Sequence, residues 1–334
     1  MTSPGKTTIS DVARVAGVSV ATVSKVLNDR YGVAVGTAAR VQSVIDDLGY
    51  ESSLVARSLR SRRTNVIGVL VADFEPFSTE LLKGISRAVR GSGYELLAYS
   101  GGGRAGSNVG WERRYLSRLG GTLIDGAILV TPTVVDGDYA IPVVAVDPHT
   151  GPSDLPTVDS DNRAGAVLAT EYLLGLGHRR IGFLGGRPDL KSARLREEGY
   201  RSSLERAGIA FDPDLVRVAG YREDTADQPA RELLSLAEPP TAIFAANDLS
   251  AIRTMDVARE LGRVVPDDLS VIGFDNVPES ALTTPPLTTI SQPIQRMGFE
   301  AMRLIIDLID GREVLEPHRR LPTALVERGS CRAR

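Results

Sequence analysis

The sequence predicts an α/β protein in two parts. An N-terminal helix-turn-helix domain precedes a larger body of two similar subdomains, each built on a doubly wound parallel sheet. The first observation behind this prediction is a pair of short, apolar-periodic segments, separated by one glycine, in residues 9–28. The second is that apolar runs alternate with amphipathic segments from residue 65, and that this alternation restarts after residue 160. The third is the charge: residues 1–64 contain nine Lys or Arg and five Asp or Glu, or +4 in a chain of net charge −3, which leaves −7 for the remainder.

The first helix is expected to begin near Ser10, with Ser10 or Thr8 as its N-cap. Gly17 fits the left-handed position of the turn that ends this helix. Ala13 is small where a second helix would cross closely. The inward face of the first helix is predicted to hold Val12, Val15 and Ala16.

The second helix is expected to follow Ser19, which can cap it, and to turn Val23, Val26 and Leu27 inward. Short hydroxyl side chains on its outer face allow a close approach to the major groove of DNA, where Lys25 can reach a phosphate or a guanine edge. The same pattern also fits a plain helical hairpin with a solvated outer face. The outward positions are Val20, Ala21, Thr22, Ser24, Lys25 and Asn28.

A third helix is predicted over residues 37–48, ended by Gly49. Its inward side chains are expected to be Val41, Val44, Ile45 and Leu48.

The next stretch, "SSLVARSLRSRRTN", is too short and too basic to form a stable helix alone. Such a segment can fold when phosphates neutralise its arginines, among them Arg57. Leu59 has no core to join there, so it can act as a wedge between base pairs in the minor groove. The alternative is a flexible basic linker. We call residues 1–64 the head and the remainder of the chain the body. A basic head and an acidic body indicate that the head binds a polyanionic partner.

The body is predicted from its β–α alternation. Buried strands are expected over residues 65–73, 94–100, 126–132, 142–147, 180–186, 241–248 and 269–276. Amphipathic helices are expected over residues 77–93, 107–121, 161–177, 192–208 and 249–262.

Ligands of open α/β sheets bind at the carboxyl ends of the strands, so two such halves predict a cleft between them. The residues that follow these strands are rich in Asp and Asn, with arginine and aromatic side chains nearby. Paired donors and acceptors beside flat apolar rings suit a sugar, although polar strand ends are common to all such folds. The candidates from this reasoning are Asp73, Phe74, Glu75, Phe77, Ser100, Thr131, Asp147, His149, Arg187, Arg196, Asn247, Asp248, Asp275 and Asn276.

The head resembles that of the lactose-repressor (LacI/GalR) family of bacterial transcription regulators. The matching blocks are "TISDVARVAGVSVATVSKVLN", "RVQSVIDDLGY" and "LVARSLRSRRTNVIGVLV", at matching spacings. The resemblance implies operator DNA as a partner, and a hinge helix over residues 53–61 with Leu59 as its intercalating residue. Ser52 and Ser53 stand where the family often has Pro-Asn, and Ala21 stands where the family often has a long polar side chain that reads the bases, so the resemblance implies DNA binding but no particular operator sequence. The implied DNA contacts are Thr8, Ser19, Val20, Ala21, Thr22, Ser24, Lys25, Asn28, Arg57 and Leu59.

The resemblance continues through the body to about residue 328, on "GHRRIGFLGG", "SARLREEGYRSSL", "FAANDLSAI", "VIGFDNVPES" and "PPLTTISQP". It implies a periplasmic-binding-protein-like effector domain that takes a small sugar or oligosaccharide. Arg196, Asn247 and Asp275 are the first effector contacts that the motifs imply, followed by Asp147. The remaining candidates are Phe74, Phe77, Arg222 and Gln292.

The same resemblance divides the chain into a DNA-binding domain (1–52), a hinge (53–64) and an effector domain (65–334). Within the effector domain, one subdomain covers about 65–161 and 293–320, and the other about 162–290 and 321–334. The family is dimeric through its body, so we expect a homodimer on a near-palindromic operator. A tetramer stays open. Candidate dimer surfaces are "FSTELLKGISRAV" and the region near residue 280.

Several other classes are disfavoured. The chain has no apolar run near the ~20 residues of a membrane span and no signal-peptide core at its start, so we expect a cytoplasmic protein. One cysteine, Cys331, allows no internal disulfide. HExxH, GxSxG and P-loop motifs are missing, so no enzyme, metal or cofactor is expected. The glycines of residues 101–106 are interpreted as a flexible loop rather than a nucleotide site.

A transport-type sugar-binding protein without DNA function is the second hypothesis. The body alone permits it, whereas the head argues against it. Comparing the DNA affinity of the whole chain with that of a chain starting at Asn65 distinguishes the two.

Overall fold

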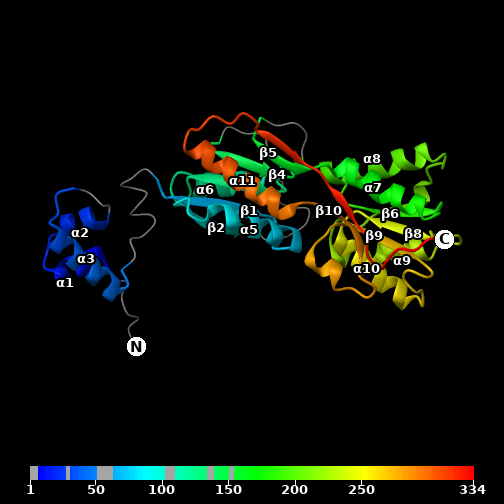
Figure 1. The fold of residues 1–334 in the computed structure, drawn as a ribbon, viewed down its shortest axis with the longest axis horizontal. Coiled ribbons are helices and arrows are strands. Elements are labelled where there is room, and N and C mark those ends of the chain that lie inside the picture. Colours follow the sequence, from blue (N-terminus) through cyan, green and yellow to red (C-terminus); the bar gives the residue numbers. More distant parts are fainter. Residues whose placement is uncertain (1–6, 28–30, 51–62, 102–109, 134–138, 150–153) are drawn as a thin grey trace. The chain divides into compact units, whose positions relative to one another are not determined.

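The computed structural model describes residues 7–27, 31–50, 63–101, 110–133, 139–149 and 154–334. It divides into two compact units, Met1–Thr64 and Asn65–Arg334 (Figure 1). Two of the predicted DNA-binding parts lie outside the described residues. They are Asn28 and the hinge helix, which contains Arg57 and Leu59. Within the described part of the chain, no helix is long and apolar enough to cross a bilayer.

The described residues of the N-terminal unit form three short helices: α1 (Ile9–Ala16), α2 (Val20–Leu27) and α3 (Val35–Leu48). Thr8 caps α1 in a capping box, because its hydroxyl accepts from Asp11 N while the Asp11 carboxylate accepts from Thr8 N. Gly17 ends α1 in the left-handed conformation at φ 66°, and Ser19 Oγ accepts from Thr22 N at 3.1 Å. The expected caps and turn are therefore confirmed.

The core of this unit is small. Its buried members are Val12, Ala13, Ala16, Val23, Val41 and Ile45. The inward prediction for Val15 is wrong, because this side chain is 51% exposed. At about 100° per residue, Val15 lies roughly 100° from the middle of the face that Val12, Ala13 and Ala16 bury. Val26, Leu27, Val44 and Leu48 are half-buried against the same core.

One sheet of the body, with its helices, forms what we call the first lobe. All its strands are parallel, in the order β11-β5-β4-β3-β1-β2. The strands are β1 (Val66–Val71), β2 (Glu95–Ser100), β3 (Gly126–Val130), β4 (Val143–Val146), β5 (Thr157–Ser160) and β11 (His318–Leu321). The helices are α5 (Pro76–Val89), α6 (Trp111–Leu119) and α11 (Ile294–Ile309).

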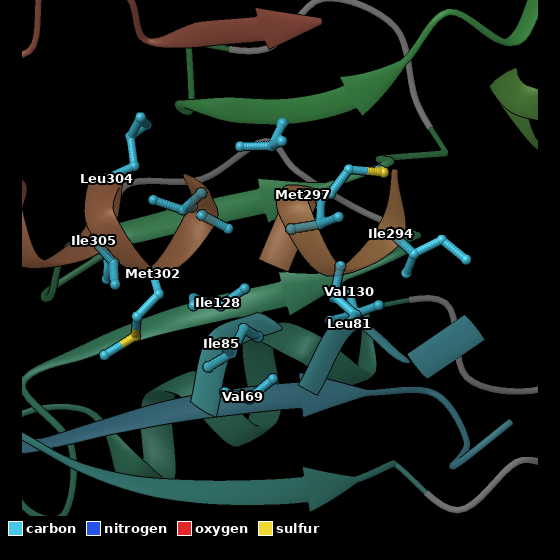
Figure 2. Packing of buried hydrophobic residues seen from close by; sticks show 14 of the residues in the cluster. Val69, Leu81, Ile85, Ile128, Val130, Ile294, Met297, Met302, Leu304 and Ile305 are labelled. Carbon is cyan, nitrogen blue, oxygen red and sulfur yellow. The ribbon is translucent and has the colours of Figure 1, made fainter. Parts of the chain in front are cut away.

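Two of these helices, α5 and α11, pack on each other and on the sheet. Figure 2 shows Leu81 and Ile85 of α5 next to Ile294, Met297 and Met302 of α11. The approach is close because each helix presents a glycine to the other. A Cβ atom at Gly84 would collide with the Gln295 carbonyl, and one at Gly298 with the Leu81 carbonyl. The α5–α11 contact therefore depends on two side-chain-free positions.

The second lobe is built on the sheet β12-β10-β9-β8-β6-β7, in which only β12 runs antiparallel to its neighbour. Helices α7 and α8 cover one face of the sheet and α9 and α10 the other (Figure 1). The strands are β6 (Ile181–Gly185), β7 (Val216–Val218), β8 (Ala242–Ala245), β9 (Ser270–Asp275), β10 (Thr288–Ser291) and β12 (Ala324–Val326). The helices are α7 (Asn162–Gly175), α8 (Lys191–Arg206), α9 (Glu223–Leu234), α10 (Asp248–Glu260) and the 3-10 turns Pro213–Leu215 and Pro278–Ala281.

In its described residues the chain passes between the lobes three times: from β5 to α7, from β10 to α11, and from β11 to β12. The first passage leaves the carboxyl end of β5 in the first lobe, and the second leaves the carboxyl end of β10 in the second lobe. The carboxyl ends of both sheets therefore face the boundary between the lobes, which is where ligands of such sheets bind.

Candidate functional site

The outer face of α2 is small and weakly charged. Val20 is 39% exposed, Ala21 and Lys25 are exposed, and Thr22 and Ser24 are half-buried. The Ser19 hydroxyl lies 2.9 Å from Thr22 Oγ1, so the two hydroxyls hold each other at the start of the helix. Thr8 is engaged as the cap of α1, where its hydroxyl donates to Asp11 Oδ2 at 2.6 Å. Among the predicted DNA contacts that the structure describes, Lys25 is the one with a charged side chain, and it is exposed.

A cavity of about 260 Å³ lies between the lobes. This volume lies just below the range of about 300–1,000 Å³ that is usual for ligand pockets. The first lobe contributes Ala72, Asp73, Glu75, Phe77, Ser78, Gly101, Trp111, Thr131, Thr133, Asp147 and His149 to its wall. The second lobe contributes Arg187, Leu190, Ser192, Arg196, Gly220, Tyr221, Arg222, Asn247 and Asp275, and Gln292 comes from the passage after β10.

Arg196, on α8, is the cation at the centre of the wall and is 3% exposed. Its Nη1 lies 3.5 Å from Asp275 Oδ1 and donates to the carbonyl of Ala246. Its Nε donates to Asn162 Oδ1 at 2.8 Å. The guanidinium also lies over the Phe274 ring, 3.8 Å from the ring centroid. These contacts hold a buried charge in one orientation and leave Nη2 as a further donor.

Asp275, at the end of β9, is the acceptor opposite Arg196. It receives a 2.6 Å hydrogen bond from Gln292 Nε2, and Gln292 Oε1 in turn accepts from Ser160 Oγ. Burial raises the pKa of Asp275 to about 6, against the opposing effects of Arg196 and Gln292. The carboxyl group therefore titrates close to neutral pH.

Asp147, at the end of β4, is a second buried acid, and burial raises its pKa although Arg196 opposes this. Asn162 Nδ2 donates to Asp147 Oδ1 at 3.3 Å. Because Asn162 Oδ1 accepts from Arg196, one amide joins the acid of the first lobe to the cation of the second.

Four residues of the cavity wall have backbones in the left-handed region although none is glycine. They are Thr131 (φ 47°), Asp147 (φ 46°), Tyr221 (φ 68°) and Asp275 (φ 112°). Such conformations are costly and collect at functional sites, where surrounding contacts enforce them. At these positions of the cavity wall, the fold therefore places the side chains at the cost of an unfavourable backbone conformation.

Asn247 has a role that the sequence did not predict. Its Oδ1 accepts from Ser250 N at 3.1 Å and caps α10, and its Nδ2 donates to the carbonyl of Tyr221 at 2.9 Å. Asn247 thus fixes the turn that presents Tyr221, and one amide hydrogen remains for a ligand.

His149 lines the cavity as a neutral ring. Burial, with Arg187 nearby, lowers its pKa to about 4. Its backbone carbonyl accepts from Lys191 N at 3.0 Å, which is a direct bond between the lobes.

The sequence-predicted effector residues do not all reach the cavity. Phe74 is 50% exposed and lies instead in a neighbouring, more open groove. Those that line the cavity are Phe77, Asp147, Arg196, Arg222, Asn247, Asp275 and Gln292. Sequence reasoning missed Trp111 and Tyr221, two aromatic rings of the wall. Each directly follows a glycine, Gly110 or Gly220, whose φ is positive in the structure, and the glycine is the part of this signal that the sequence shows.

Charged acceptors and donors around aromatic rings suit a polyhydroxylated ligand, whose hydroxyls bridge the polar groups while its C–H faces cover the rings. Among the described residues, no group of three His, Cys, Asp or Glu side chains is placed to hold a metal ion. A helix-turn-helix unit and a two-lobed ligand unit in one chain define a DNA-binding regulator that responds to a small molecule.

Comparison with known proteins agrees with this class. Residues 8–53 match the family described as bacterial regulatory proteins, lacI family, and residues 170–331 match the periplasmic binding protein-like domain. The chain is 33% identical over 333 residues to the HTH-type transcriptional repressor CytR of Escherichia coli (strain K12), which covers 98% of this chain and 96% of that protein.

Two solved structures are also similar. One is a lac repressor dimer bound to operator and the anti-inducer ONPF, with a TM-score of 0.84 and 27% identity over 98% of this chain and 99% of that one. The other is the transcriptional regulator CelR in complex with cellobiose, with a TM-score of 0.73 and 31% identity over 97% and 99%. The chain belongs to the lacI family of bacterial regulatory proteins and is a DNA-binding transcription regulator.

Proposed function

We propose that this protein represses genes for carbohydrate use, and that a small sugar or oligosaccharide in the cavity releases it from its operator. The observation that carries the proposal is the set of buried donors and acceptors that both lobes direct at one cavity, with Asp147, Arg196 and Asp275 at its centre. The similar regulator CelR binds cellobiose, which supports a carbohydrate as the ligand class.

In this proposal the ligand hydroxyls bond to Asp147, Arg196 and Asp275, and to the free amide hydrogen of Asn247. Gln292 supports Asp275 from the passage between the lobes. The rings of Phe77, Trp111 and Tyr221 cover the apolar faces of the sugar. The cavity does not require a charged ligand, because acids and arginines occur in it in nearly equal numbers.

On DNA, we propose that α2 enters the major groove through Val20, Ala21, Thr22, Ser24 and Lys25, with Ser19 at its start and Thr8 supporting α1. Asn28, Arg57 and Leu59 are retained as contacts on the basis of the sequence alone. One such head reads only a few base pairs, so two heads on a near-palindromic operator are expected. A homodimer supplies them, and the exposed side of α5 and Leu282, which is 81% exposed, are the proposed dimer surfaces.

The proposed mechanism is a linkage between the cavity and the heads. A ligand that bonds to both lobes favours one angle between them, and in a dimer that angle sets the separation of the two hinge segments. Hinges held apart cannot place Leu59 in the minor groove, and affinity for the operator falls. A preference of about 1–3 kcal/mol for one lobe arrangement is enough to change occupancy severalfold or more. The site of action is the cytoplasm, where the DNA lies, and no catalytic step is involved.

The test begins with an operator selected by the purified protein from a random duplex library. A panel of mono-, di- and oligosaccharides is then screened by thermal shift, because a ligand of the native state raises the melting temperature. A saccharide that raises Tm should also lower operator affinity in fluorescence anisotropy.

Arg196→Ala should abolish the response to the saccharide and leave operator affinity intact, because Arg196 lies in the cavity and not in the head. Arg231→Ala is the matched control, since Arg231 pairs with Asp227 and Glu260 away from the cavity. Equal DNA affinity of the whole chain and of a chain starting at Asn65 would contradict the proposal, as would a panel in which no saccharide binds.

A further inference from the structure

We propose that Arg222 limits the length of the saccharide that the cavity accepts, because it closes one end of the cavity through an ion pair between the lobes. This inference rests on the proposed function, since it concerns the same cavity and the same ligand class. The resemblance implied that Arg222 contacts the sugar. The present proposal is that Arg222 instead forms a partition at one end of the cavity and so determines which saccharides fit.

Two hollows of the body share this partition. One is the cavity, and the other is the more open groove that contains Phe74, which we call the outer groove. Asp73, Glu75 and Arg222 belong to the walls of both. The rest of the outer groove is formed by Phe74, Glu223, Asp224, Asp227, Leu249 and Arg253. The three shared side chains therefore separate the cavity from the groove.

The partition spans the lobes. Asp73 and Glu75 follow β1 in the first lobe, whereas Arg222 precedes α9 in the second. Arg222 Nη1 lies 3.4 Å from Glu75 Oε1 and 3.6 Å from Asp73 Oδ2. Its Nε donates to Asp224 Oδ1 at 3.1 Å, so the guanidinium is held from its own lobe while it reaches the other. A ligand that extends from the cavity into the groove must displace this side chain.

The backbone fixes the place from which Arg222 reaches across. Gly220 and Tyr221 both have positive φ, and Asn247 Nδ2 holds the Tyr221 carbonyl at 2.9 Å. Thr225 Oγ1 contacts the Arg222 carbonyl at 3.3 Å. Hydrogen bonds therefore hold the backbone turn on both sides of Arg222. Only the Arg222 side chain has to move for the partition to open.

The outer groove can take a further sugar unit once the partition is open. Phe74, half exposed, offers a ring for a sugar face, and the carboxylates of Asp73, Glu75 and Asp224 are freed as acceptors for hydroxyls. With the partition closed, these acids are engaged with the guanidinium instead.

Removal of the Arg222 side chain should change the ligand specificity of the protein more than its folding stability. The side chains of Arg222, Asp73 and Glu75 are 36%, 45% and 35% exposed, and ion pairs of this exposure contribute little to stability. Specificity set by blocking a space is lost when the blocking group is removed, even if no attractive contact is added.

The experiment compares the wild type with Arg222→Ala by isothermal titration calorimetry. The ligands are glucose, cellobiose, cellotriose and cellotetraose, and the matching α(1→4) series from maltose to maltotetraose. In the wild type, one unit beyond the best-bound length should weaken binding at least about tenfold. In Arg222→Ala this penalty should shrink to within about threefold. Arg180→Ala is the control, since its side chain is 33% exposed and pairs with Asp212 at 2.9 Å, and neither residue lines either hollow.

A second variant tests the partition from the other lobe. Asp73→Asn combined with Glu75→Gln removes the partners of Arg222 and should relax the length preference in the same way. The proposal is overturned if both variants keep the wild-type length preference, if Arg222→Ala weakens all lengths equally, or if the wild type binds the tetrasaccharides best. Binding of no saccharide by the wild type overturns the proposed function, and the partition with it.

Discussion

Gln292 Nε2 donates a 2.6 Å hydrogen bond to Asp275 Oδ1, while Gln292 Oε1 accepts from Ser160 Oγ. Ser160 and Gln292 stand at two of the three passages between the lobes, and Asp275 ends β9 at the cavity wall. A change in the hydrogen bonds of Asp275 therefore affects Gln292 and, through it, Ser160. These two residues lie at the passages where a movement of one lobe relative to the other would take place. Differential bonding of this kind is what a ligand needs in order to favour one arrangement of the lobes.

Asp275 should make ligand affinity depend on pH. Burial raises the pKa of this carboxyl to about 6, and a hydroxyl that donates to it forms a stronger hydrogen bond with the ionised form than with the protonated one. We expect affinity for the best-bound saccharide to be highest above pH 6 and to fall as the pH decreases below it. Calorimetry on both sides of pH 6 measures this. Asp275→Asn should bind more weakly with a flatter pH dependence, and an unchanged slope would assign the titration to another group.

The same group should affect stability in the opposite direction. Its folded pKa of about 6 lies above the ordinary value of 3.8, so the fold prefers the protonated form. The stability that this preference contributes is complete below the ordinary pKa and is lost as the pH rises through about 6. In the absence of ligand, the stability of the wild type relative to Asp275→Asn should therefore decrease over this window. Denaturant titrations at both ends of the window check it.

The long strands and the head were predictable because their signals are local. Thr8 and Gly17 mark the ends of α1, and β1, β3, β4, β6 and β8 are continuous apolar runs. The shorter strands β5, β7, β10, β11 and β12 were not predicted. The pair β11 and β5 shows why: His318 pairs with Thr157, about half the chain away, and neither segment is apolar along its length. Distant pairing decides such strands, not local pattern.

Two helices were missed for different reasons. In α9, Pro229 lies inside the helix, which in a sequence argues against one. The segment of α11 begins directly after the family block "PPLTTISQP" and was not predicted as a helix, although its apolar face is strong.

The candidate site was predictable where it follows strand ends and was not where it depends on turns. Asp147 directly follows β4 and Asp275 ends β9, so the carboxyl-end rule located them. Tyr221 follows a strand of three residues, and its position depends on Asn247 in another element. The outer position of Phe74 likewise depends on how the two lobes meet, which no local pattern encodes.

The close approach of α5 and α11 should make Gly84 intolerant of any side chain. A methyl group there collides with the backbone carbonyl of Gln295, so Gly84→Ala must push the helices apart or deform them. We expect a loss of about 1–3 kcal/mol in the free energy of unfolding, as for other overpacked cores. Gly175→Ala is the control, since beyond the adjoining backbone of α7 no atom lies within 4 Å of a Cβ there, and it should be neutral or slightly stabilising. Equal denaturation midpoints for the two variants would contradict the packing argument.

The two bonds of Asn247 can be separated by substitution. Asn247→Asp keeps an acceptor for Ser250 N at the start of α10 and replaces the donor to the Tyr221 carbonyl with a repelling oxygen. Ligand affinity should therefore fall while the stability of α10 is retained. Asn247→Ala removes both bonds and should also cost about 1 kcal/mol of stability through the lost cap. Saccharide titrations and thermal melts of the two variants distinguish these roles, and equal effects on stability would show that the cap bond is not important.

Lys25 should contribute to DNA binding mainly through a phosphate. It is exposed near the end of α2, on a face whose other side chains are short, so its ammonium group can reach the DNA backbone. Lys25→Ala should weaken binding to specific and random duplexes alike and reduce the slope of log affinity against log salt by about 1. Arg231→Ala changes the net charge of the whole chain by the same amount and should leave the slope unchanged. If Lys25→Ala instead keeps the slope and loses discrimination at one operator position, Lys25 contacts a base edge.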